Sequence, residues 1–306
     1  MNVNSTNKKY DFPPIPSKKF NKMLPDGTAL VLEGGGMRGY YSAGVFEGFM
    51  EHGIMFPYII GVSAGAANAL TYISGQPMRS RQIVENFAGS PNYVSIRNLF
   101  RYGSMFNREL VFRTIPKNHV FFDFDALQNC PIRFLTGAMD CKTGDVVWFE
   151  KNALTNNLEI TEASCAVPMM APIVKYDNFE LLDGGIPAPI PIEKSISDGN
   201  RFHVIVLTQN NGYTKKPFTK TALAKIIYRK YPNVVKTLIK RHEIYNRQLA
   251  LCEELEKEGK AIIIRPKEPL QVGRTTRDTK LLLELYDEGH RECNEVVERI
   301  INHGNI

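Results

Sequence analysis

Two glycine-rich turns, each directly after a short apolar stretch, constrain the fold of this chain more than any other feature. The first turn, residues 34–39, reads Gly-Gly-Gly-Met-Arg-Gly and follows the apolar stretch 29–32. The second, residues 61–65, reads Gly-Val-Ser-Ala-Gly and follows Tyr-Ile-Ile at 58–60. Apolar strands that lead into helices through tight turns are typical of a buried parallel sheet covered by helices. The chain is therefore predicted to be an α/β protein with a largely parallel sheet.

The rest of the chain continues this alternation of strands and helices. Hairpin turns are expected at 142–145 and 177–178, where Gly, Asp and Asn gather between apolar stretches. Strands are predicted over 28–33, 58–61, 132–139, 145–149, 172–175, 179–182, 203–208 and 261–265. Helices are predicted over 38–52, 63–74, 159–166 and 278–302, and a further helix from Pro232.

Composition narrows the class of protein. The chain has 306 residues, of which 43% are apolar and 23% charged, as in an ordinary globular protein. Its first 22 residues are polar and rich in lysine, unlike a signal peptide, and no stretch reaches the roughly 18 apolar residues of a membrane span. The five cysteines are an odd number without close spacing, so neither a disulfide framework nor a metal site is predicted. A cytoplasmic protein with reduced thiols is expected.

Positive charge is concentrated in one segment. The net charge is +6, and residues 213–250 contain ten Lys or Arg against one acid, Glu243. This bias suits a phospholipid surface or nucleic acid as partner, but a solvated helix face has the same composition. We favour the helix face, which places four apolar residues toward the core: Leu223, Ile227, Leu238 and Leu249. No nucleic-acid partner is predicted, peripheral contact with an anionic membrane stays open, and the oligomeric state is not indicated.

The first turn matches the G-x-G-x-x-G pattern, so nucleotide binding has to be weighed. A dinucleotide site needs an acidic residue about 20 positions further on, at the end of the next strand. Here that strand runs into Gly61-Val62-Ser63 instead. A phosphate-binding P-loop would need Gly-Lys-Ser/Thr, which does not follow. No cofactor is therefore predicted, and a dehydrogenase is kept only as a third option.

Three adjacent glycines suit an anion-binding loop instead. Backbone N–H groups from Gly35 to Met37 can converge on a small anion, helped by the N-terminus of the following helix. Arg38 either adds a fixed cation or is an ordinary exposed arginine. The predicted loop comprises the whole turn: Gly34, Gly35, Gly36, Met37, Arg38 and Gly39.

The second turn places Ser63 at the boundary between a strand and a helix. Small residues on both sides, Gly61 and Gly65 among them, permit the sharp turn and close packing of a nucleophile elbow. A serine at this position also suits the N-cap of the helix, and the two roles are compatible. An anion-binding loop beside an exposed serine is what acyl transfer requires. The sequence therefore predicts a serine hydrolase.

A serine hydroxyl needs a group that accepts its proton, and two arrangements stay open. In the order Ser–Asp–His of α/β-hydrolases, Asp183 would orient His203 as the base. His203, however, begins an apolar strand, whereas such a histidine normally lies on a loop beyond a strand's end. In the second arrangement Asp183 acts directly. It ends a strand and is followed by Gly184 and Gly185, which allow close approach of the backbone.

Three of these segments together resemble the patatin-like phospholipase family. The matching motifs, in the family's order, are G-G-G-x-R-G at 34–39, G-x-S-x-G at 61–65 and D-G-G at 183–185. Ala163-Ser164, followed by Pro168 and Pro172, is also similar to the family segment ahead of the aspartate. The resemblance covers roughly residues 28–210.

This resemblance implies a three-layer α/β/α fold and a lipid acyl hydrolase or esterase that uses a Ser–Asp dyad. It assigns Ser63 as the nucleophile, Asp183 as the base and the loop 34–39 as the oxyanion hole. The C-terminal part is similar to that of bacterial family members, and no substrate transfers with it. Three parts are predicted: a tail over 1–24, a patatin-like hydrolase domain over 25–212, and a basic, mostly helical extension over 213–306.

The resulting hypothesis is a serine esterase or lipid acyl hydrolase that cleaves carboxylic esters, phospholipids included, without a cofactor. One alternative keeps the reaction but uses His203 in a Ser-His-Asp triad. Another is a membrane-surface or regulatory binding module that has the same fold without turnover, motivated by the basic stretch 215–247.

Overall fold

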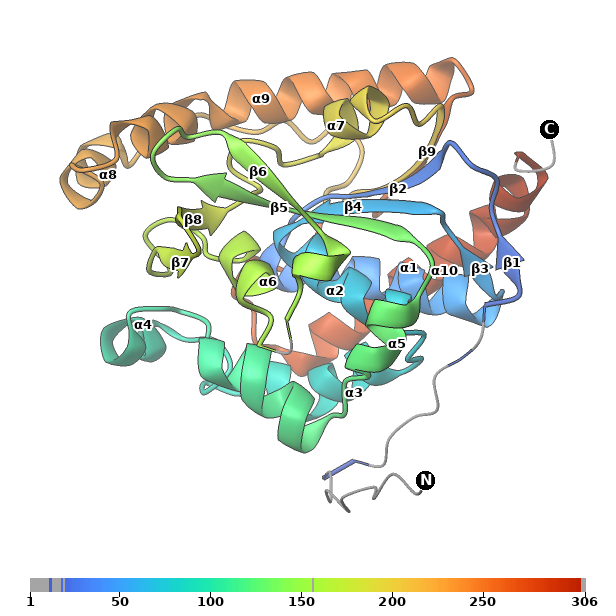
Figure 1. Ribbon diagram of the computed structural model, residues 1–306, viewed down its shortest axis with the longest axis horizontal. Helices are drawn as coiled ribbons and strands as arrows, with labels where there is room; N and C mark the ends of the chain where they lie inside the picture. Colours follow the sequence, from blue (N-terminus) through green and yellow to red (C-terminus); the bar gives the residue numbers. More distant parts are fainter. Residues whose placement is uncertain (1–10, 13–17, 19, 156, 304–306) are drawn as a thin grey trace.

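The computed structural model describes residues 11–12, 18, 20–155 and 157–303 (Figure 1). Most of the predicted tail, 1–24, lies outside these residues. The described part of the chain contains an eight-stranded sheet in the order β10-β9-β2-β4-β5-β8-β7, with β6 also beside β5. Its strands are β2 (Thr28–Leu32), β4 (Tyr58–Val62), β5 (Arg133–Asp140), β6 (Val146–Glu150), β7 (Val174–Tyr176), β8 (Phe179–Asp183), β9 (Phe202–Val206) and β10 (Ala261–Ile264). A separate parallel pair joins β1 (Lys22–Met23) to β3 (Ile54–Met55).

The centre of the sheet is parallel, as predicted. Neighbouring strands from β10 through β9, β2 and β4 to β5 all run in the same direction. β6 and β8 run antiparallel to β5, and β7 runs antiparallel to β8. The hairpins β5–β6 and β7–β8 turn at the positions that the sequence indicates, 142–145 and 177–178. The α/β prediction is confirmed.

β4 and β8 lie end to end along one edge of β5. β4 pairs with residues 133–137 of β5, and β8 pairs with residues 138–140. Because β6 pairs with 135–139, it occupies the other edge, and β8 has to continue along the edge of β4. The last residues of these strands, Val62 and Asp183, therefore lie opposite consecutive residues of β5. This arrangement brings together two turns that are far apart in the sequence.

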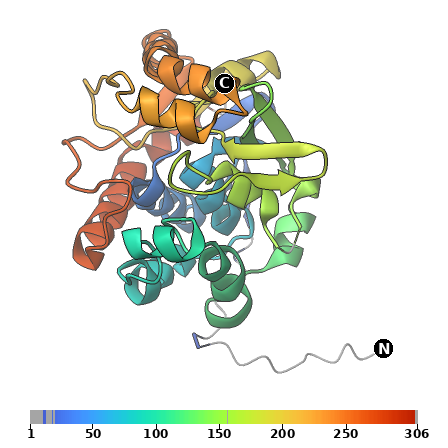
Figure 2. The ribbon, with the colours of Figure 1, turned by 90° about the vertical axis from the view of Figure 1, so that its left-hand side faces the viewer.

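Helices cover both faces of the sheet and complete the three layers (Figures 1 and 2). On one face lie α1 (Tyr40–Glu51), α2 (Ser63–Ile73), α6 (Glu159–Ser164) and α10 (Thr279–His303), and on the other α7 (Ile192–Ser197) and α9 (Pro232–Lys257). The other helical segments are α3 (Arg79–Ile83), α4 (Ile96–Tyr102), α5 (Phe124–Asn129), α8 (Thr221–Ile227), η1 (Gly36–Gly39), η2 (Val84–Ala88), η3 (Leu110–His119) and η4 (Lys151–Ala153). Strand residues alternate between the two cores: Leu30 and Leu32 join the core under α1, while Ala29 and Val31 join the one under α9.

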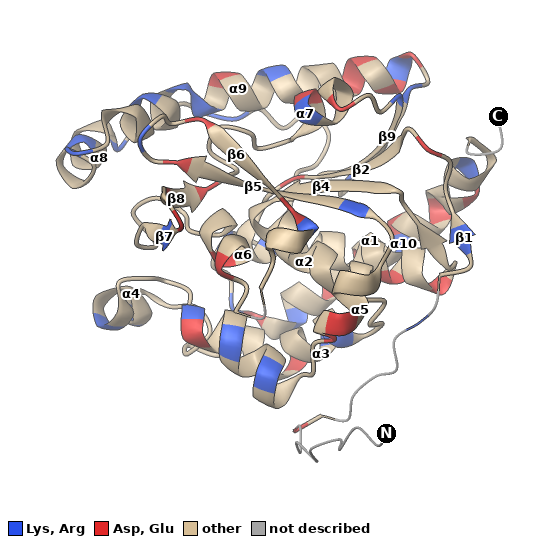
Figure 3. Ribbon diagram, viewed as in Figure 1, with Lys and Arg blue, Asp and Glu red and all other residues tan. Residues whose placement is uncertain are grey.

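The segment after residue 212 is built into the same layers. β10 extends the central sheet beside β9, and α10 packs along α1. Figure 3 shows Lys and Arg along α8 and α9. Leu238 and Leu249 are buried as predicted, but Leu223 and Ile227 are exposed, so the prediction of a core-facing stripe is wrong at α8. None of the helices in the described ranges combines the length and the apolar character that crossing a membrane requires.

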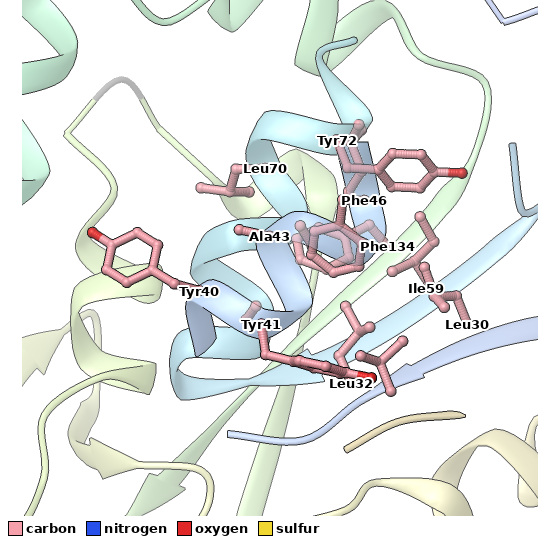
Figure 4. Packing of buried hydrophobic residues seen from close by; sticks show 14 of the residues in the cluster. Leu30, Leu32, Tyr40, Tyr41, Ala43, Phe46, Ile59, Leu70, Tyr72 and Phe134 are labelled. Carbon is pink, nitrogen blue, oxygen red and sulfur yellow. The ribbon is translucent and has the colours of Figure 1, made fainter. Parts of the chain in front are cut away.

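The larger core lies between the sheet and the helices α1 and α2 (Figure 4). Phe46 of α1 stacks on Tyr72 of α2 with ring centroids 5.5 Å apart. The Tyr72 hydroxyl donates to the backbone carbonyl of Ile54 at 2.6 Å, so this buried polar group is satisfied. Each fully buried large apolar side chain stabilises the fold by about 1.5–3 kcal/mol. The two helices that follow the glycine-rich turns are thus held firmly on the sheet.

Candidate active site

Ser63 lies at a strained turn between β4 and α2. Its φ angle is +53°, a conformation that is costly for a residue with a side chain. Two neighbouring glycines make the turn possible. A Cβ added at Gly65 would lie 2.6 Å from the Glu33 carbonyl oxygen, and one added at Gly61 would lie 2.9 Å from the Ala66 nitrogen. The small residues of this motif are therefore required by packing.

The backbone of this turn is held by Ser164, the last residue of α6. The Ser63 N–H donates to Ser164 Oγ at 2.8 Å, and Ser164 Oγ donates in turn to the Gly137 carbonyl at 2.6 Å. Val62 is the N-cap of α2, and the Ser63 side chain makes no capping hydrogen bond. The expected N-cap role of Ser63 is therefore wrong, and its hydroxyl is directed elsewhere.

The structure brings Ser63 and Asp183 together. Ser63 Oγ donates to Asp183 Oδ2 at 2.9 Å, and the two side chains are only 6% and 4% exposed. The second carboxylate oxygen, Oδ1, accepts from the Gly185 N–H at 2.7 Å. Arg241 Nε donates to the Gly185 carbonyl at 2.7 Å, which fixes the turn that carries the aspartate. The catalytic roles of the two residues stay a prediction, but their geometry suits direct proton transfer.

Burial raises the pKa of Asp183 above the usual value for an aspartate. Hydrogen bonds from Gly185 and Ser63, and the positive charges of Arg241 and Arg274, oppose this rise. A carboxylate with a raised pKa holds a proton more tightly. Asp183 is therefore a better proton acceptor than an exposed aspartate, while the surrounding donors still favour its charged form.

His203 is not brought to this site. It lies on β9 opposite Ala29, three residues before β2 ends. Its Nδ1 is within hydrogen-bond distance of Ser195 Oγ, at 3.2 Å, and burial lowers its pKa to about 4. Among the described residues that line the cavity around Ser63 and Asp183 there is no histidine. The geometry thus does not supply the imidazole that the triad alternative needs.

The glycine loop packs against Ser63, and side chains would not fit in it. A Cβ added at Gly34 would lie 2.9 Å from Ser63 Cβ, and one at Gly35 would lie 2.8 Å from Thr208 Oγ1. Gly36 has a φ angle of +60° and faces the Arg274 carbonyl, where an added Cβ would come to 2.7 Å. The loop therefore brings bare backbone beside the hydroxyl.

Two of the three expected N–H donors in this loop are free. Gly35 is the N-cap of η1 and Gly36 is its first residue, and their N–H groups donate to no acceptor among the described residues. The Met37 N–H is different, because it donates to the Arg274 carbonyl at 3.1 Å. The expectation that Met37 also donates to an anion is therefore wrong, and the predicted oxyanion hole keeps only Gly35 and Gly36 as candidate donors.

The last residues of the loop hold it in place rather than line the site. With the Gln209 amide oxygen turned toward Arg38, that oxygen accepts from both terminal guanidinium nitrogens at 3.1 and 3.2 Å. The Gly39 carbonyl accepts from Asn68 Nδ2 at 2.8 Å. Arg38 is thus neither an exposed arginine nor a lining residue of the two cavities beside Ser63.

Two cavities meet at Ser63. The first, called the apolar cavity below, is lined by Tyr40, Tyr93, Phe106, Val111, Phe112 and Met170 among others. The second, called the cationic cavity, is lined by Gly34, Gly35, Asp183, Gly185, Arg241 and Arg274 among others. Ser63 and Gly36 line both. No cluster of three or more His, Cys, Asp or Glu side chains suited to a metal occurs in the described ranges.

Sequence reasoning missed part of this site. It noted Ser164 only through the family resemblance, and it did not single out Arg241 or Arg274 as site residues. A serine on a short helix and arginines in a basic segment carry no local signal of function. Only the folded arrangement places Arg241 and Arg274 in a cavity wall beside Ser63 and places Ser164 against the Ser63 N–H.

The fold and the Ser63–Asp183 contact define a class: three-layer α/β/α proteins with a serine at a strand–helix elbow. The sequence profile described as patatin-like phospholipase matches residues 30–195, more than half of the chain. The chain therefore belongs to the patatin-like phospholipase family. A second profile, described as a domain of unknown function (DUF6363), matches residues 231–303.

One relative is the uncharacterized protein YjjU of Escherichia coli (strain K12), which is 30% identical over 190 residues. The match covers 60% of this chain and 52% of YjjU, so the chain spans about half the length of that relative. Among solved structures, VipD from Legionella pneumophila is similar with a TM-score of 0.44 and 13% identity, over 92% of this chain and 68% of that one.

Proposed function

We propose that the chain is a serine lipid acyl hydrolase that cleaves carboxylic esters of lipids, phospholipids included, with Ser63 as nucleophile and Asp183 as base. The observation that carries the proposal is the 2.9 Å hydrogen bond from Ser63 Oγ to Asp183 Oδ2, beside the two free N–H groups of Gly35 and Gly36. Membership of the patatin-like phospholipase family supports the same class of activity.

The proposed reaction has two steps. Ser63 Oγ attacks the ester carbonyl carbon while Asp183 takes the hydroxyl proton, and the N–H groups of Gly35 and Gly36 receive the negative charge on oxygen. The bond to the alcohol then breaks, the alcohol takes the proton from Asp183, and an acyl-serine remains. Water then attacks this acyl-serine while Asp183 takes a proton from it. The bond to Ser63 Oγ breaks, Ser63 Oγ takes the proton from Asp183, and the acid is released. Losing one oxyanion donor typically costs roughly 10²–10³ in kcat, so the two N–H groups carry much of the rate.

The apolar cavity fits the acyl chain of such an ester. Its wall is mostly aromatic and aliphatic, with Phe106, Val111 and Phe112 among its members. The two charged residues that also line it, Arg108 and Glu162, form an ion pair with each other. Tyr40 and Tyr93 close part of it, and their hydroxyls lie 3.2 Å apart, so these polar tips satisfy each other. A hydrocarbon chain therefore meets no unpaired hydroxyl from this pair on entering the cavity.

An active-site-directed fluorophosphonate is expected to label the protein at Ser63, because the reagent modifies a serine whose proton has an acceptor. Mass spectrometry of the labelled peptides checks the position. Ser63→Ala should take up no label, while Ser197→Ala, which changes an exposed serine on α7, should be labelled like the unchanged protein. A label on another residue with Ser63 unmodified would contradict the proposed nucleophile.

The proposed enzyme also contacts an anionic membrane peripherally, through α4 and α8. Both helices expose large apolar side chains: Phe100 is 85% exposed and Ile226 is 71% exposed. They lie at the same end of the molecule, with the β7–β8 hairpin between them (Figures 1 and 2). Exposed basic residues accompany them, which complements a negative surface: Arg97, Arg101, Lys220, Lys225, Arg229 and Lys230.

Both helices are joined to the rim of the two cavities. The Met169 N–H donates to the hydroxyl of Tyr228, directly after α8, at 2.8 Å. The N–H of Met105, a few residues after α4, donates to the Met170 carbonyl at 2.8 Å. Since Met170 lines both cavities, binding of α4 and α8 to lipid would bring the rim of the site to the membrane surface.

Phe100→Asp combined with Ile226→Asp is expected to weaken binding to vesicles of phosphatidylglycerol at least about 10-fold, because each change removes an apolar side chain worth about 1.5–3 kcal/mol when buried. Co-sedimentation measures the binding. Met23→Asp, which changes an exposed residue at the other end of the molecule, is the matched control. Unchanged binding by the double variant would remove the proposed surface, whereas binding without any fluorophosphonate labelling would favour a binding module.

A further inference from the structure

The two cavities beside Ser63 divide the space around a bound ester. Ser63 lines both cavities, whereas Asp183 lines only the cationic one. In the proposed function the departing alcohol takes its proton from Asp183, so the alcohol has to lie in the cavity that Asp183 lines. The acyl chain then occupies the apolar cavity. This assignment of the two sides, and the ligand inferred from it, rest on the proposed function.

Two arginines from the C-terminal part of the chain line the cationic cavity. Arg241 projects from α9, and Arg274 lies in the loop between β10 and α10. Arg241 uses its Nε for the Gly185 carbonyl. Its terminal nitrogens and the whole Arg274 guanidinium make no hydrogen bond or ion pair with any residue in the described ranges. Partly buried guanidinium groups without an acceptor are costly unless a ligand supplies one.

The surroundings of this cavity carry more positive than negative charge. The interacting groups are the cations Arg38, Lys215, Arg241 and Arg274 and the acids Glu33 and Asp183. Burial, together with the charges of Arg241 and Arg274, lowers the pKa of Lys215 to about 7. Burial and the charge of Arg274 lower the pKa of Arg241 to about 10. Neighbouring cations lower one another's pKa when no anion lies between them.

We infer that the cationic cavity binds a phosphate group carried by the alcohol portion of the substrate ester, and that Arg241 and Arg274 recognise it. A guanidinium presents parallel N–H donors that match two oxygens of a phosphate. Two such groups bring two positive charges to a ligand that carries one or two negative charges. The phosphate itself does not react: the only bond that breaks is the carboxylic ester between the acyl group and the alcohol.

This inference gives the C-terminal part of the chain a role at the site. Both arginines fall within residues 231–303, the part matched by the domain of unknown function. The hydrogen bond from the Met37 N–H to the Arg274 carbonyl ties the loop of the arginine to the glycine loop. The position of Arg274 is therefore fixed relative to the N–H donors of Gly35 and Gly36.

The test measures binding in the Ser63→Ala protein, which holds an ester without cleaving it. The probes are a medium-chain monoacylglycerol phosphate below its critical micelle concentration, the matching monoacylglycerol, and inorganic phosphate, each followed by calorimetry. The phosphorylated lipid is expected to bind about 10–100-fold more tightly than the unphosphorylated one, the usual contribution of charge-assisted hydrogen bonds. Inorganic phosphate should bind at least about 10-fold more weakly than the phosphorylated lipid, because it lacks the acyl chain.

Adding Arg274→Gln should reduce the preference for the phosphorylated lipid to about 2-fold or less, and Arg274→Lys should restore part of it. Arg277→Gln, an exposed arginine of the same loop, is the matched control and should keep the full preference. Equal preferences in Arg274→Gln and Arg277→Gln would overturn the inference. So would inorganic phosphate binding as tightly as the phosphorylated lipid, because the cavity would then serve a free anion.

The same lipids separate this inference from the proposed function. Hydrolysis of both lipids by the unchanged protein, without any preference in binding, would overturn only the phosphate assignment. Binding that prefers phosphate and depends on Arg274, without hydrolysis of either lipid, would overturn only the proposed reaction.

Discussion

Replacing Ser63 with alanine is expected to lower kcat for a soluble carboxylic ester on the order of 10⁴-fold or more, because the attacking oxygen is removed. Asp183→Asn is expected to cost on the order of 10³–10⁴-fold. It keeps the size of the side chain and one carbonyl oxygen but removes the ability to accept the Ser63 proton. Steady-state kinetics with a chromogenic ester measures both losses. The circular dichroism spectrum of each variant shows whether it is folded like the unchanged protein.

His203→Gln is the control that separates the two possible bases. His203 lies on β9 with Ser195 as its neighbour, so its replacement should leave kcat within about 3-fold, as is usual for a position outside the reacting groups. If His203→Gln instead removes activity and Asp183→Asn leaves it, the proposed dyad is wrong. Comparable losses in all three variants would point to a shared effect on folding, which the spectrum would reveal.

The pH dependence of kcat/KM tests the same role of Asp183 as the base, because the direction of the change can be predicted. Asp183 accepts a proton only when it is ionised, so kcat/KM should fall as the pH is lowered through its pKa. Burial raises that pKa, which puts the midpoint above the usual value of about 3.9. Arg241 and Arg274 are the cations that oppose the rise, so Arg274→Gln should move the midpoint to higher pH. A midpoint that stays fixed in that variant would contradict the electrostatic account.

Much of the site could be predicted because its parts are local. The glycine loop and the serine turn each combine an apolar strand, small residues and a helix start within a few positions. Asp183 is marked by the two glycines that come after it. The sequence does not indicate that β4 and β8 both pair with the same edge of β5, because strand register is set by tertiary packing. The resemblance to a family filled that gap for Ser63 and Asp183.

The remaining residues could not be predicted, for two physical reasons. Arg274 enters the site from a loop more than two hundred residues beyond the glycine loop, and no local pattern records such a contact. The Met37 N–H donates to the carbonyl of Arg274 in that same loop. The number of N–H groups that stay free in the glycine loop therefore also depends on this distant contact. At α8 the apolar stripe is real, but a helical pattern does not say which partner covers it. Leu223 and Ile227 therefore appeared to be core residues although they are exposed.

Gly44→Val is expected to lower the free energy of unfolding by about 3 kcal/mol or more, because α1 and α10 touch backbone to backbone there. A Cβ added at Gly44 would lie 1.9 Å from the Tyr286 carbonyl oxygen, and one added at Gly289 would lie 2.1 Å from the Tyr41 carbonyl oxygen. Backbone cannot move aside as a flexible side chain can, so the helices have to separate. Helix propensity offers no explanation for a loss, since valine is the better helix former of the two.

Urea unfolding followed by circular dichroism measures this effect, with Ala250→Val on the exposed face of α9 as the matched control. The control should cost only about 0.5 kcal/mol, the propensity difference alone. Because α10 covers α1 and β10 extends the central sheet, we expect one cooperative transition that shifts as a whole in Gly44→Val. Two separate unfolding transitions, of which Gly44→Val shifts only one, would show that residues 213–306 fold as an independent unit. The arginines at the site would then come from a domain that docks on the hydrolase rather than one that completes its fold.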